Sequence, residues 1–394
     1  MATATQPAPA ATRPQSSPLP LPTPELVARM VKSAPGVSDL ILSPGRPPQV
    51  ERTGKLVAVE VPQLALLKPE HTARIAAEII GTQKKPLETL KEEGACDLSY
   101  SVPGTGRFRV NIFQQRGSYA IVMRVIPDRI PGFEELNLPG ELKKIAELKN
   151  GIVLVTGPTG SGKSSTLAAV IDLINSTKPE HILTIEDPIE FLHQHKVGTI
   201  HQRELHSDTP TFSLALRAAL RQAPKVILVG EMRDKETIEI AMTAAETGHL
   251  VLSTLHTIDA SKTVERIVGV FPAADQQAIR RRLATSFRYF IAQRLLPRRD
   301  GKGRIAVLEI LKSTLRTREY VEKGETEGKT LLDAMRDGNE DGMQYFDGEI
   351  ERLIRERTIT INTGLTYSTN AGNLRLQLAD FKEEETEAAP GVAS

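Results

Sequence analysis

Apolar runs and helical patterns alternate along the second half of the chain. Four near-continuous apolar runs have the character of parallel strands that are covered on both faces. They lie at residues 151–156, 182–185, 226–229 and 250–252. Amphipathic patterns between them predict helices over 164–176, 211–222 and 235–247. This rhythm predicts an α/β domain built on a mostly parallel sheet. Beyond Asp275 the pattern predicts mainly helices, apart from one strand over 305–310.

The first third of the chain has a different pattern, in which short apolar runs are separated by Pro and Gly. A helix is predicted from Pro24 and a second over 69–80, ended by Gly81. Strands are predicted between 37 and 61 and over 98–102, 107–114 and 120–126. These elements predict a small α+β domain over 25–130.

The remaining boundaries follow from composition. A proline-bearing linker is predicted over 131–141, and the α/β domain with its C-terminal helices over 142–381. Residues 1–24 are mostly Ala, Pro, Thr, Ser and Gln, which predicts a disordered tail because such a segment cannot bury enough apolar surface. Residues 382–394 are acidic and then small, and a frayed end is predicted there.

Composition narrows the function classes. No run of eighteen apolar residues and no signal-peptide pattern is visible, so the protein is predicted to be cytoplasmic. The one cysteine, Cys96, excludes a disulfide framework and a four-thiolate zinc site. Lys and Arg number 50 against 49 acidic residues, and aromatic residues make up 4% of the chain, so no nucleic-acid partner is expected.

A phosphate-binding loop is the strongest local signal. The sequence GPTGSGKS at 157–164 fits the pattern G-x-x-x-x-G-K-[ST], with an apolar strand before it and a helix after it. Its backbone N–H groups and its lysine would cradle phosphates, and the Ser164 hydroxyl would bind Mg²⁺. The alternative is a glycine-rich turn. The predicted nucleotide contacts are Gly157, Pro158, Thr159, Gly160, Ser161, Gly162, Lys163, Ser164 and Ser165.

Three predicted strands end in polar residues that could do chemistry, since ligands of open α/β sheets bind beyond the carboxyl ends of strands. Glu231 follows the run at 226–229 and could hold Mg²⁺ or polarise the attacking water; otherwise it is a solvated strand end. The acids of 186–190 could also belong to an Asp-Pro turn. His249 and His256 flank the run at 250–252; a lone histidine is more often structural than catalytic, and the pattern alone leaves the two roles of these residues about even.

Taken together, these motifs resemble those of the secretion ATPase superfamily, in particular the type IV pilus retraction ATPases of the PilT and PilU type. GPTGSGKSST at 157–166 is similar to the family's Walker A motif, and HILTIEDPIEF at 181–191 to its Asp box. GEMRD at 230–234 resembles its Walker B motif, and ETGHLVLSTLHT at 246–257 its His box. The resemblance is close over about 25–310 and looser beyond.

The resemblance implies a homohexameric, Mg²⁺-dependent ATPase in which a PAS-like N-terminal domain is joined to a RecA-like core. It implies that ATP binds between the two domains and at the subunit boundary, with arginines of the small domain reaching the phosphates. Arg109 and Arg124 match those arginines, although either could be a solvated strand residue. Glu190 matches the catalytic glutamate of the Asp box better than Glu186 does. The two histidines match the His-box pair, which is thought to sense the nucleotide.

The cysteine content and two differences from the usual family sequence indicate which branch of the superfamily the chain resembles most. Pilus extension ATPases resemble this core but carry an extra N-terminal domain and usually a four-cysteine zinc motif, so the chain favours retraction. Ala223 and Lys225 stand where the family usually has acids before Walker B, which affects local magnesium or interface electrostatics. The stretch 314–321 keeps little of the C-terminal helix typical of PilT, which favours an accessory, PilU-like role.

The leading hypothesis is therefore a cytoplasmic motor at the inner face of the inner membrane, which hydrolyses ATP to retract and disassemble a pilus. Its implied partners are the inner-membrane pilus platform protein and a paralogous retraction ATPase. The alternative is an accessory subunit that binds ATP with little hydrolysis; a nucleic-acid translocase is the least favoured. A basic cluster between 280 and 299 is predicted to be a solvated or subunit-facing helix, with an acidic platform or membrane surface as the alternative.

Overall fold

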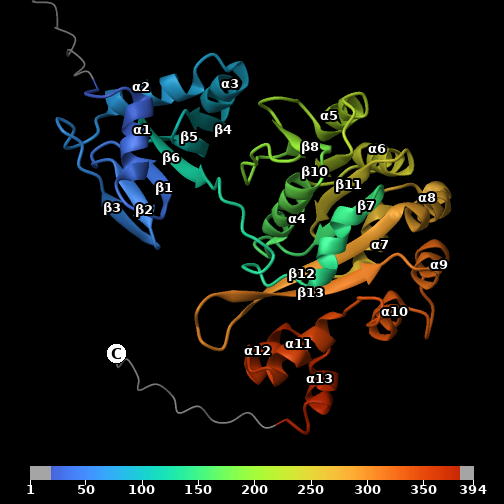
Figure 1. Ribbon diagram of the computed structural model, residues 1–394. Helices are drawn as coiled ribbons and strands as arrows, with labels where there is room; N and C mark the ends of the chain where they lie inside the picture. Colours follow the sequence, from blue (N-terminus) through green and yellow to red (C-terminus); the bar gives the residue numbers. More distant parts are fainter. Residues whose placement is uncertain (1–18, 382–394) are drawn as a thin grey trace, which may run out of the picture. The chain divides into compact units, whose positions relative to one another are not determined.

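The computed structural model describes residues 19–381, and the chain divides into two compact units, Met1–Pro127 and Asp128–Ser394 (Figure 1). The predicted frayed end at 382–394 and the first eighteen positions of the predicted N-terminal tail lie outside the described residues. The first helix begins at Thr23, inside the range predicted to be a tail.

The first unit is a six-stranded antiparallel sheet with three helices. Its elements are α1 Thr23–Lys32, β1 Val37–Leu42, β2 Gln49–Arg52, β3 Lys55–Ala58, α2 Pro69–Ile80, α3 Lys84–Glu93, β4 Ala95–Val102, β5 Gly106–Gln115 and β6 Ser118–Ile126. The strand order is β3-β2-β1-β6-β5-β4, and every neighbouring pair is antiparallel. This arrangement fits the predicted α+β class; its PAS-like assignment stays a prediction.

Alternation along the strands explains how the first unit buries one face of its sheet. In β5, Phe108, Val110 and Ile112 are buried with residues of α1, α2 and α3, whereas Arg109 between them is exposed. The predicted helix at 69–80 is confirmed: proline occupies its first turn and Gly81 follows it with φ +55°. Helix α3 was not predicted, because Leu90 is its one buried residue.

The second unit is an α/β fold on a seven-stranded sheet. It begins with the 3₁₀ helix η1 Gly140–Glu147. The elements that follow are β7 Gly151–Thr156, α4 Lys163–Thr177, β8 His181–Glu186, β9 Thr199–Glu204, α5 Phe212–Ala219, β10 Val226–Val229, α6 Lys235–Glu246, β11 Leu250–Leu255, α7 Ala260–Gly269, α8 Ala273–Ser286, β12 Phe287–Pro297, β13 Arg304–Lys312, α9 Leu315–Lys323, α10 Leu331–Asp337, α11 Phe346–Arg355, α12 Ile361–Tyr367 and α13 Ala371–Gln377.

The sheet of the second unit confirms the predicted parallel strands. Its order is β13-β12-β7-β11-β10-β8-β9, and all neighbours are parallel except the β12–β13 pair. Separate hydrophobic clusters cover its two faces, one with η1 and α4 and the other with α5 to α8. Buried on both faces, the central strands carry no exposed residue, which is why they read as continuous apolar runs.

The prediction of mainly helical structure beyond Asp275 is wrong for residues 287–297, which form β12. This strand pairs with β13, and Figure 1 shows the long hairpin with α11, α12 and α13 beside it. Polar residues such as Gln293 and Arg294 interrupt its apolar run, so the pattern of apolar residues does not predict this strand. The predicted strand at 305–310 is confirmed by β13.

The basic cluster is therefore not one solvated helix. Arg282 of α8 pairs with Glu246, and Arg281 with Glu322. Arg288 of β12 donates to backbone carbonyls at the end of α8, and Arg294 lies over the Phe346 ring, 3.8 Å from its centroid. These arginines hold elements of the second unit together. Among residues 19–381, no helix is both long and apolar enough to cross a membrane.

Candidate nucleotide-binding site

The loop between β7 and α4 has the backbone shape that a phosphate loop needs. Gly160 and Gly162 adopt φ angles of +78° and +89°, which L side chains rarely take. A Cβ at Gly162 would also lie 2.7 Å from Nε2 of Gln293, so the end of that side chain would have to shift. Helix α4 starts at the next residue, so its free N–H groups and positive dipole end meet the loop.

Lys163 is directed into this loop. Its Nζ donates to the carbonyl oxygens of Gly157 at 2.9 Å and Pro158 at 3.1 Å, and the residue is 8% exposed. Burial lowers the pKa of Lys163, and the nearby carboxylates of Glu231 and Glu190 oppose that shift. A buried cation with acids close by is suited to bind a phosphate oxygen, because the anion would offset its burial.

Several polar side chains around the loop lack partners. The buried hydroxyls of Thr156, Ser161 and Ser253 form no hydrogen bond within the described residues, and the half-buried hydroxyls of Ser164 and Ser165 form none either. Buried polar groups in folded proteins are almost always paired. A phosphate group with its bound metal and waters would satisfy such groups, so this donor set fits a nucleotide.

Gln293 of β12 holds the loop in place, a role that the sequence did not reveal. It is 2% exposed, its Oε1 accepts from the Thr166 hydroxyl at 2.7 Å, and its Nε2 donates to the Ser161 carbonyl at 2.8 Å. The Gln293 backbone also packs closely on the loop, since a Cβ at Gly157 would lie 2.4 Å from the Gln293 main-chain oxygen. One strand side chain therefore fixes both the loop and the first turn of α4.

Replacing Gln293 by Leu is expected to weaken nucleotide binding about 10-fold or more. The change leaves the Thr166 hydroxyl and the Ser161 carbonyl buried without partners, at a cost of roughly 1–3 kcal/mol each. Titration with a fluorescent ADP analogue measures the affinity. Gln344→Leu is the matched control, because Gln344 donates to the Leu308 carbonyl of the same hairpin, outside the loop. Equal affinity in Gln293→Leu and wild-type protein would contradict the clamp.

Glu231 lies just beyond β10, as predicted from the sequence. Its carboxylate contacts Nη2 of Arg233 at 2.6 Å and Nε2 of His256 at 3.3 Å. Burial alone would raise the pKa of Glu231, but the hydrogen bond from Arg233 and the charges of Arg233 and His256 outweigh it, so the pKa lies below its usual value. The side chain is therefore an anion at neutral pH, as a metal-shell ligand or a water-polarising group must be.

Glu186 at the end of β8 and Glu190 in the loop after it differ in their surroundings. Glu186 accepts from Thr184 at 2.6 Å and from Gln202 at 3.1 Å, and burial raises its pKa. These bonds give Glu186 a structural role, whereas Glu190 is exposed and near enough to act on Lys163. Buried Glu204 of β9 accepts from the Ile189 N–H at 3.0 Å and so fixes the loop that carries Glu190. Sequence reasoning missed Glu204 because it missed β9.

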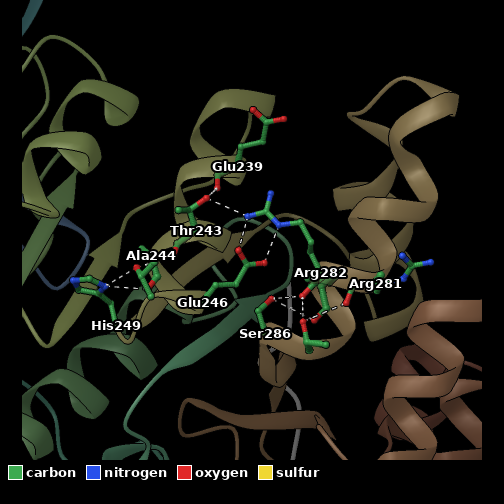
Figure 2. Close-up of polar contacts among 11 residues, drawn as sticks. Glu239, Thr243, Ala244, Glu246, His249, Arg281, Arg282 and Ser286 are labelled. Atoms are coloured by element: carbon green, nitrogen blue, oxygen red, sulfur yellow. Dashed lines mark hydrogen bonds and ion pairs between the residues drawn. The ribbon is translucent and has the colours of Figure 1, made fainter.

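The two histidines lie at opposite ends of β11. His256 follows the strand and contacts Glu231, but His249 precedes it, and six strand residues span about 20 Å. Figure 2 shows the His249 ring beside the Ala244 carbonyl, with Nδ1 and the oxygen 2.9 Å apart. Within one chain only His256 is therefore near Lys163 and Glu231; a nucleotide contact by His249 stays a prediction.

Ala223 and Lys225, the two residues that replace the acids usual in the family, lie at the end of the sheet where His249 lies. Both precede β10, so that strand separates them from Glu231 at its other end. Their replacement of acids therefore does not touch the magnesium ligand predicted at Glu231. Ala223 has φ +53°, a left-handed conformation that Asp tolerates better than Ala. The replacement of an acid by Ala223 therefore places a less favoured residue in a left-handed turn.

Arg109 and Arg124 belong to the first unit and stand opposite each other on β5 and β6. Both are exposed, and Arg124 Nε donates to Asp39 Oδ1 at 2.9 Å. The structure brings the pair together on one face of that sheet. Their contact with a nucleotide remains a prediction.

Glu309 of β13 is a buried carboxyl that anchors the segment after His256. It is 4% exposed, and its Oε1 accepts from the Ala260 N–H at 2.8 Å, at the start of α7. Burial raises its pKa from 4.5 to about 7. The Ala260 N–H and Arg294 oppose this shift, and the carboxylates of Asp259 and Asp347 add to it.

This raised pKa predicts a pH-dependent stability. Between pH 4.5 and about 7 the unfolded chain has lost the Glu309 proton while the folded chain still holds it, so stability falls as pH rises, by on the order of 3 kcal/mol. Melting temperatures at pH 5 and pH 8 should therefore differ less in Glu309→Gln than in wild type. Exposed Glu265→Gln of α7 should keep the wild-type difference. Identical pH dependence in all three proteins would refute the assignment.

A divalent metal would find few protein ligands here. No group of three or more His, Cys, Asp or Glu side chains within residues 19–381 is arranged to hold a metal ion. Mg²⁺ in nucleotide sites needs no such group, because phosphate oxygens and waters supply most of its ligands. The Ser164 hydroxyl, which has no partner within the described residues, and the ionised Glu231 carboxylate fit that pattern.

Comparisons with known proteins agree with this geometry. Residues 97–358 match the family of type II/IV secretion system proteins. The chain is 45% identical over 336 residues to the type IV pilus retraction ATPase PilT of Pseudomonas aeruginosa, covering 85% of this chain and 95% of that protein. It is 39% identical over 352 residues to the type IV pilus ATPase PilU of the same species, covering 89% and 90%.

A solved structure extends the likeness to three dimensions. The crystal structure of the pilus retraction motor PilT with bound ADP superposes with a TM-score of 0.78 at 40% identity, covering 89% of this chain and 98% of that one.

Proposed function

The chain belongs to the type II/IV secretion system protein family, and on that premise we propose that it is the motor that drives retraction of a type IV pilus. As a member of this family it is a nucleotide-binding ATPase. The observation that carries the proposal is the 45% identity to PilT, which extends over nearly all of that protein rather than over the ATPase motifs alone.

The proposal assigns a task to each group around the phosphate loop. Lys163 and backbone N–H groups of the phosphate loop bind the phosphates, and Ser164 and Glu231 hold Mg²⁺. When bound there, Mg²⁺ would supply positive charge against the phosphate oxygens. Glu190, exposed in the loop after β8, orients the attacking water, and His256 senses the charge of Glu231.

Arg109 and Arg124 complete the proposed mechanism. Charge spreads over the equatorial oxygens of the transferred phosphoryl group, and a cation brought to them late stabilises the transition state more than the ground state. The two exposed guanidinium groups of the first unit are proposed to supply that cation in the assembled ring. Under this proposal, ATP hydrolysis is coupled to rotation of the domains.

The proposed assembly is a homohexamer that works at the inner face of the inner membrane against the pilus platform protein. A paralogous retraction ATPase is the second proposed partner, and the likeness to both PilT and PilU supports it. Contact with nucleic acid is not part of the proposal, and the near-zero net charge supports leaving it out.

One observation favours a second candidate, an accessory subunit that binds ATP with little hydrolysis and couples a partner motor to the platform. The 39% identity to PilU covers slightly more of this chain than the PilT match does. Helix α9, where the sequence departs from the PilT pattern, also begins with an 87% exposed Leu315.

Two measurements test the proposal. Deletion of the gene should leave cells with excess surface pili that do not retract; loss of pili would instead indicate an assembly motor. The purified protein should hydrolyse ATP without DNA. Nucleotide binding with no detectable turnover would favour the accessory subunit, and DNA-stimulated turnover that weakens with salt would favour a translocase.

A further inference from the structure

A row of polar residues crosses the sheet of the first unit. Asp39 of β1 pairs in register with Arg124 of β6, Arg124 pairs with Arg109 of β5, and Arg109 pairs with Ser99 of β4. Residues in register on neighbouring strands share a face and lie about 5 Å apart at Cβ. The acid therefore stands at one side of Arg124, and a second arginine stands at the other.

The three charged side chains differ in exposure and in bonding. The Asp39 side chain is 10% exposed, whereas that of Arg124 is 70% exposed. Only Nε of Arg124 is engaged, by Asp39 Oδ1 at 2.9 Å; its two terminal nitrogens have no hydrogen-bond partner in the part of the chain that the structure describes. The Arg109 side chain is exposed and has no hydrogen-bond or ion-pair partner among the described residues.

This geometry determines which atoms of Arg124 are available to a ligand. A guanidinium presents its terminal nitrogens as a fork that matches two oxygens of a phosphate. A carboxylate that binds Nε occupies the inner edge and leaves the outer fork open. Because Asp39 is nearly buried, it also holds the guanidinium at a fixed place on the sheet.

Repulsion across the strand pair makes that hold necessary. Like charges directly opposite on antiparallel strands destabilise the pair, and Arg109 and Arg124 are directly opposite. Asp39 attracts Arg124 toward β1 and away from Arg109. The two guanidinium groups can therefore lie on the same face of the sheet while Arg124 keeps one position.

We infer that Asp39 is a positioning residue that fixes the Arg124 guanidinium with its terminal nitrogens free to bind phosphate oxygens. The inference rests on the proposed contact of Arg124 with nucleotide. Asp39 itself touches no reacting atom. Its contribution comes from preorganisation, because a side chain that is already ordered loses less freedom when it binds.

A double-mutant cycle in the purified full-length protein tests this inference. We expect Arg124→Ala to lower kcat for ATP about 10³-fold, within the range seen for arginine fingers. Asp39→Ala should lower kcat about 10-fold with little change in KM, because the phosphate loop in the other unit binds the nucleotide. In the double variant, removal of Asp39 should cost nothing beyond the loss of Arg124. Asp39→Glu should recover part of kcat.

Other outcomes separate the inference from the proposed function. If Asp39→Ala lowers kcat by the same factor with and without Arg124, its role is structural and the inference is wrong. An unchanged kcat in Asp39→Ala, with Arg124→Ala impaired, overturns the inference alone. An unchanged kcat in Arg124→Ala overturns both the inference and the proposed role of Arg124.

Two further variants guard the experiment. Asp97→Ala is the matched control, since Asp97 is an exposed acid on β4 of the same sheet whose carboxylate accepts from Asn111. It should leave kcat unchanged. If Asp39→Ala does not fold, Asp39→Asn replaces it in the cycle, because the amide has the same shape and lacks the charge.

Discussion

Glu231→Gln is expected to slow steady-state ATP turnover by about 10²–10⁴-fold while nucleotide binding persists. The carboxylate is ionised at neutral pH, because Arg233 and His256 hold its pKa below the usual value against the effect of burial. Gln keeps the shape and can still accept from Arg233, but it has no charge with which to bind Mg²⁺ or polarise water. Phosphate release measures turnover, and titration with a fluorescent ADP analogue measures binding.

The matched control for this experiment is Glu236→Gln. Glu236 lies five positions further along the chain, in the first turn of α6, where its half-exposed carboxylate pairs with Arg217. Its replacement should leave turnover within about two-fold of wild type, as expected for a surface ion pair. Turnover in Glu231→Gln equal to that of the control would show that another group does the work assigned to Glu231.

Lys163→Ala is expected to weaken nucleotide binding about 10²-fold and to abolish measurable turnover. The lost charge-assisted bond to phosphate is worth up to about 3 kcal/mol. The change should not destabilise the protein without nucleotide, since burial lowers the pKa of Lys163 and so disfavours the charged form in the folded chain. Melting curves with and without ADP measure both effects together.

The expected pattern is a melting temperature without ADP at or above that of wild type, and loss of the rise that ADP produces. Lys178→Ala serves as control, because Lys178 follows the far end of α4 and pairs with Glu147. It should keep the ADP-induced rise. A rise retained in Lys163→Ala would mean that the loop does not carry the phosphate site.

Local geometry explains which parts of the site the sequence could predict. The phosphate loop is recognisable because left-handed backbone at Gly160 and Gly162 and a helix start at Lys163 must occur at fixed spacing. Glu231 could be predicted in the same way, since it directly follows a continuous buried strand. These features depend on a few consecutive residues.

Non-local pairing explains what the sequence could not predict. Gln293 and Glu204 act on the loops through strands β12 and β9, whose polar residues interrupt the apolar pattern, so neither strand was predicted. His249 and His256 were paired through the resemblance to the His box, and the extended strand between them separates them more than a helix of the same length would. Asp39, the ion-pair partner of Arg124, lies far away in the chain, and only the pairing of β1 with β6 brings the two side chains together.

The position of β7 in its sheet has a consequence for how the protein is made. The strand that leads into the phosphate loop begins at Gly151, but its two neighbours, β11 and β12, begin only at Leu250 and Phe287. At ribosomal rates of about 5–20 residues per second, β7 waits on the order of ten seconds for both. A nascent chain that has reached the end of β11 already contains Lys163, Glu190 and Glu231, yet the strand that bears Gln293 has not been synthesised. The phosphate loop is therefore synthesised well before the strands that hold it in place.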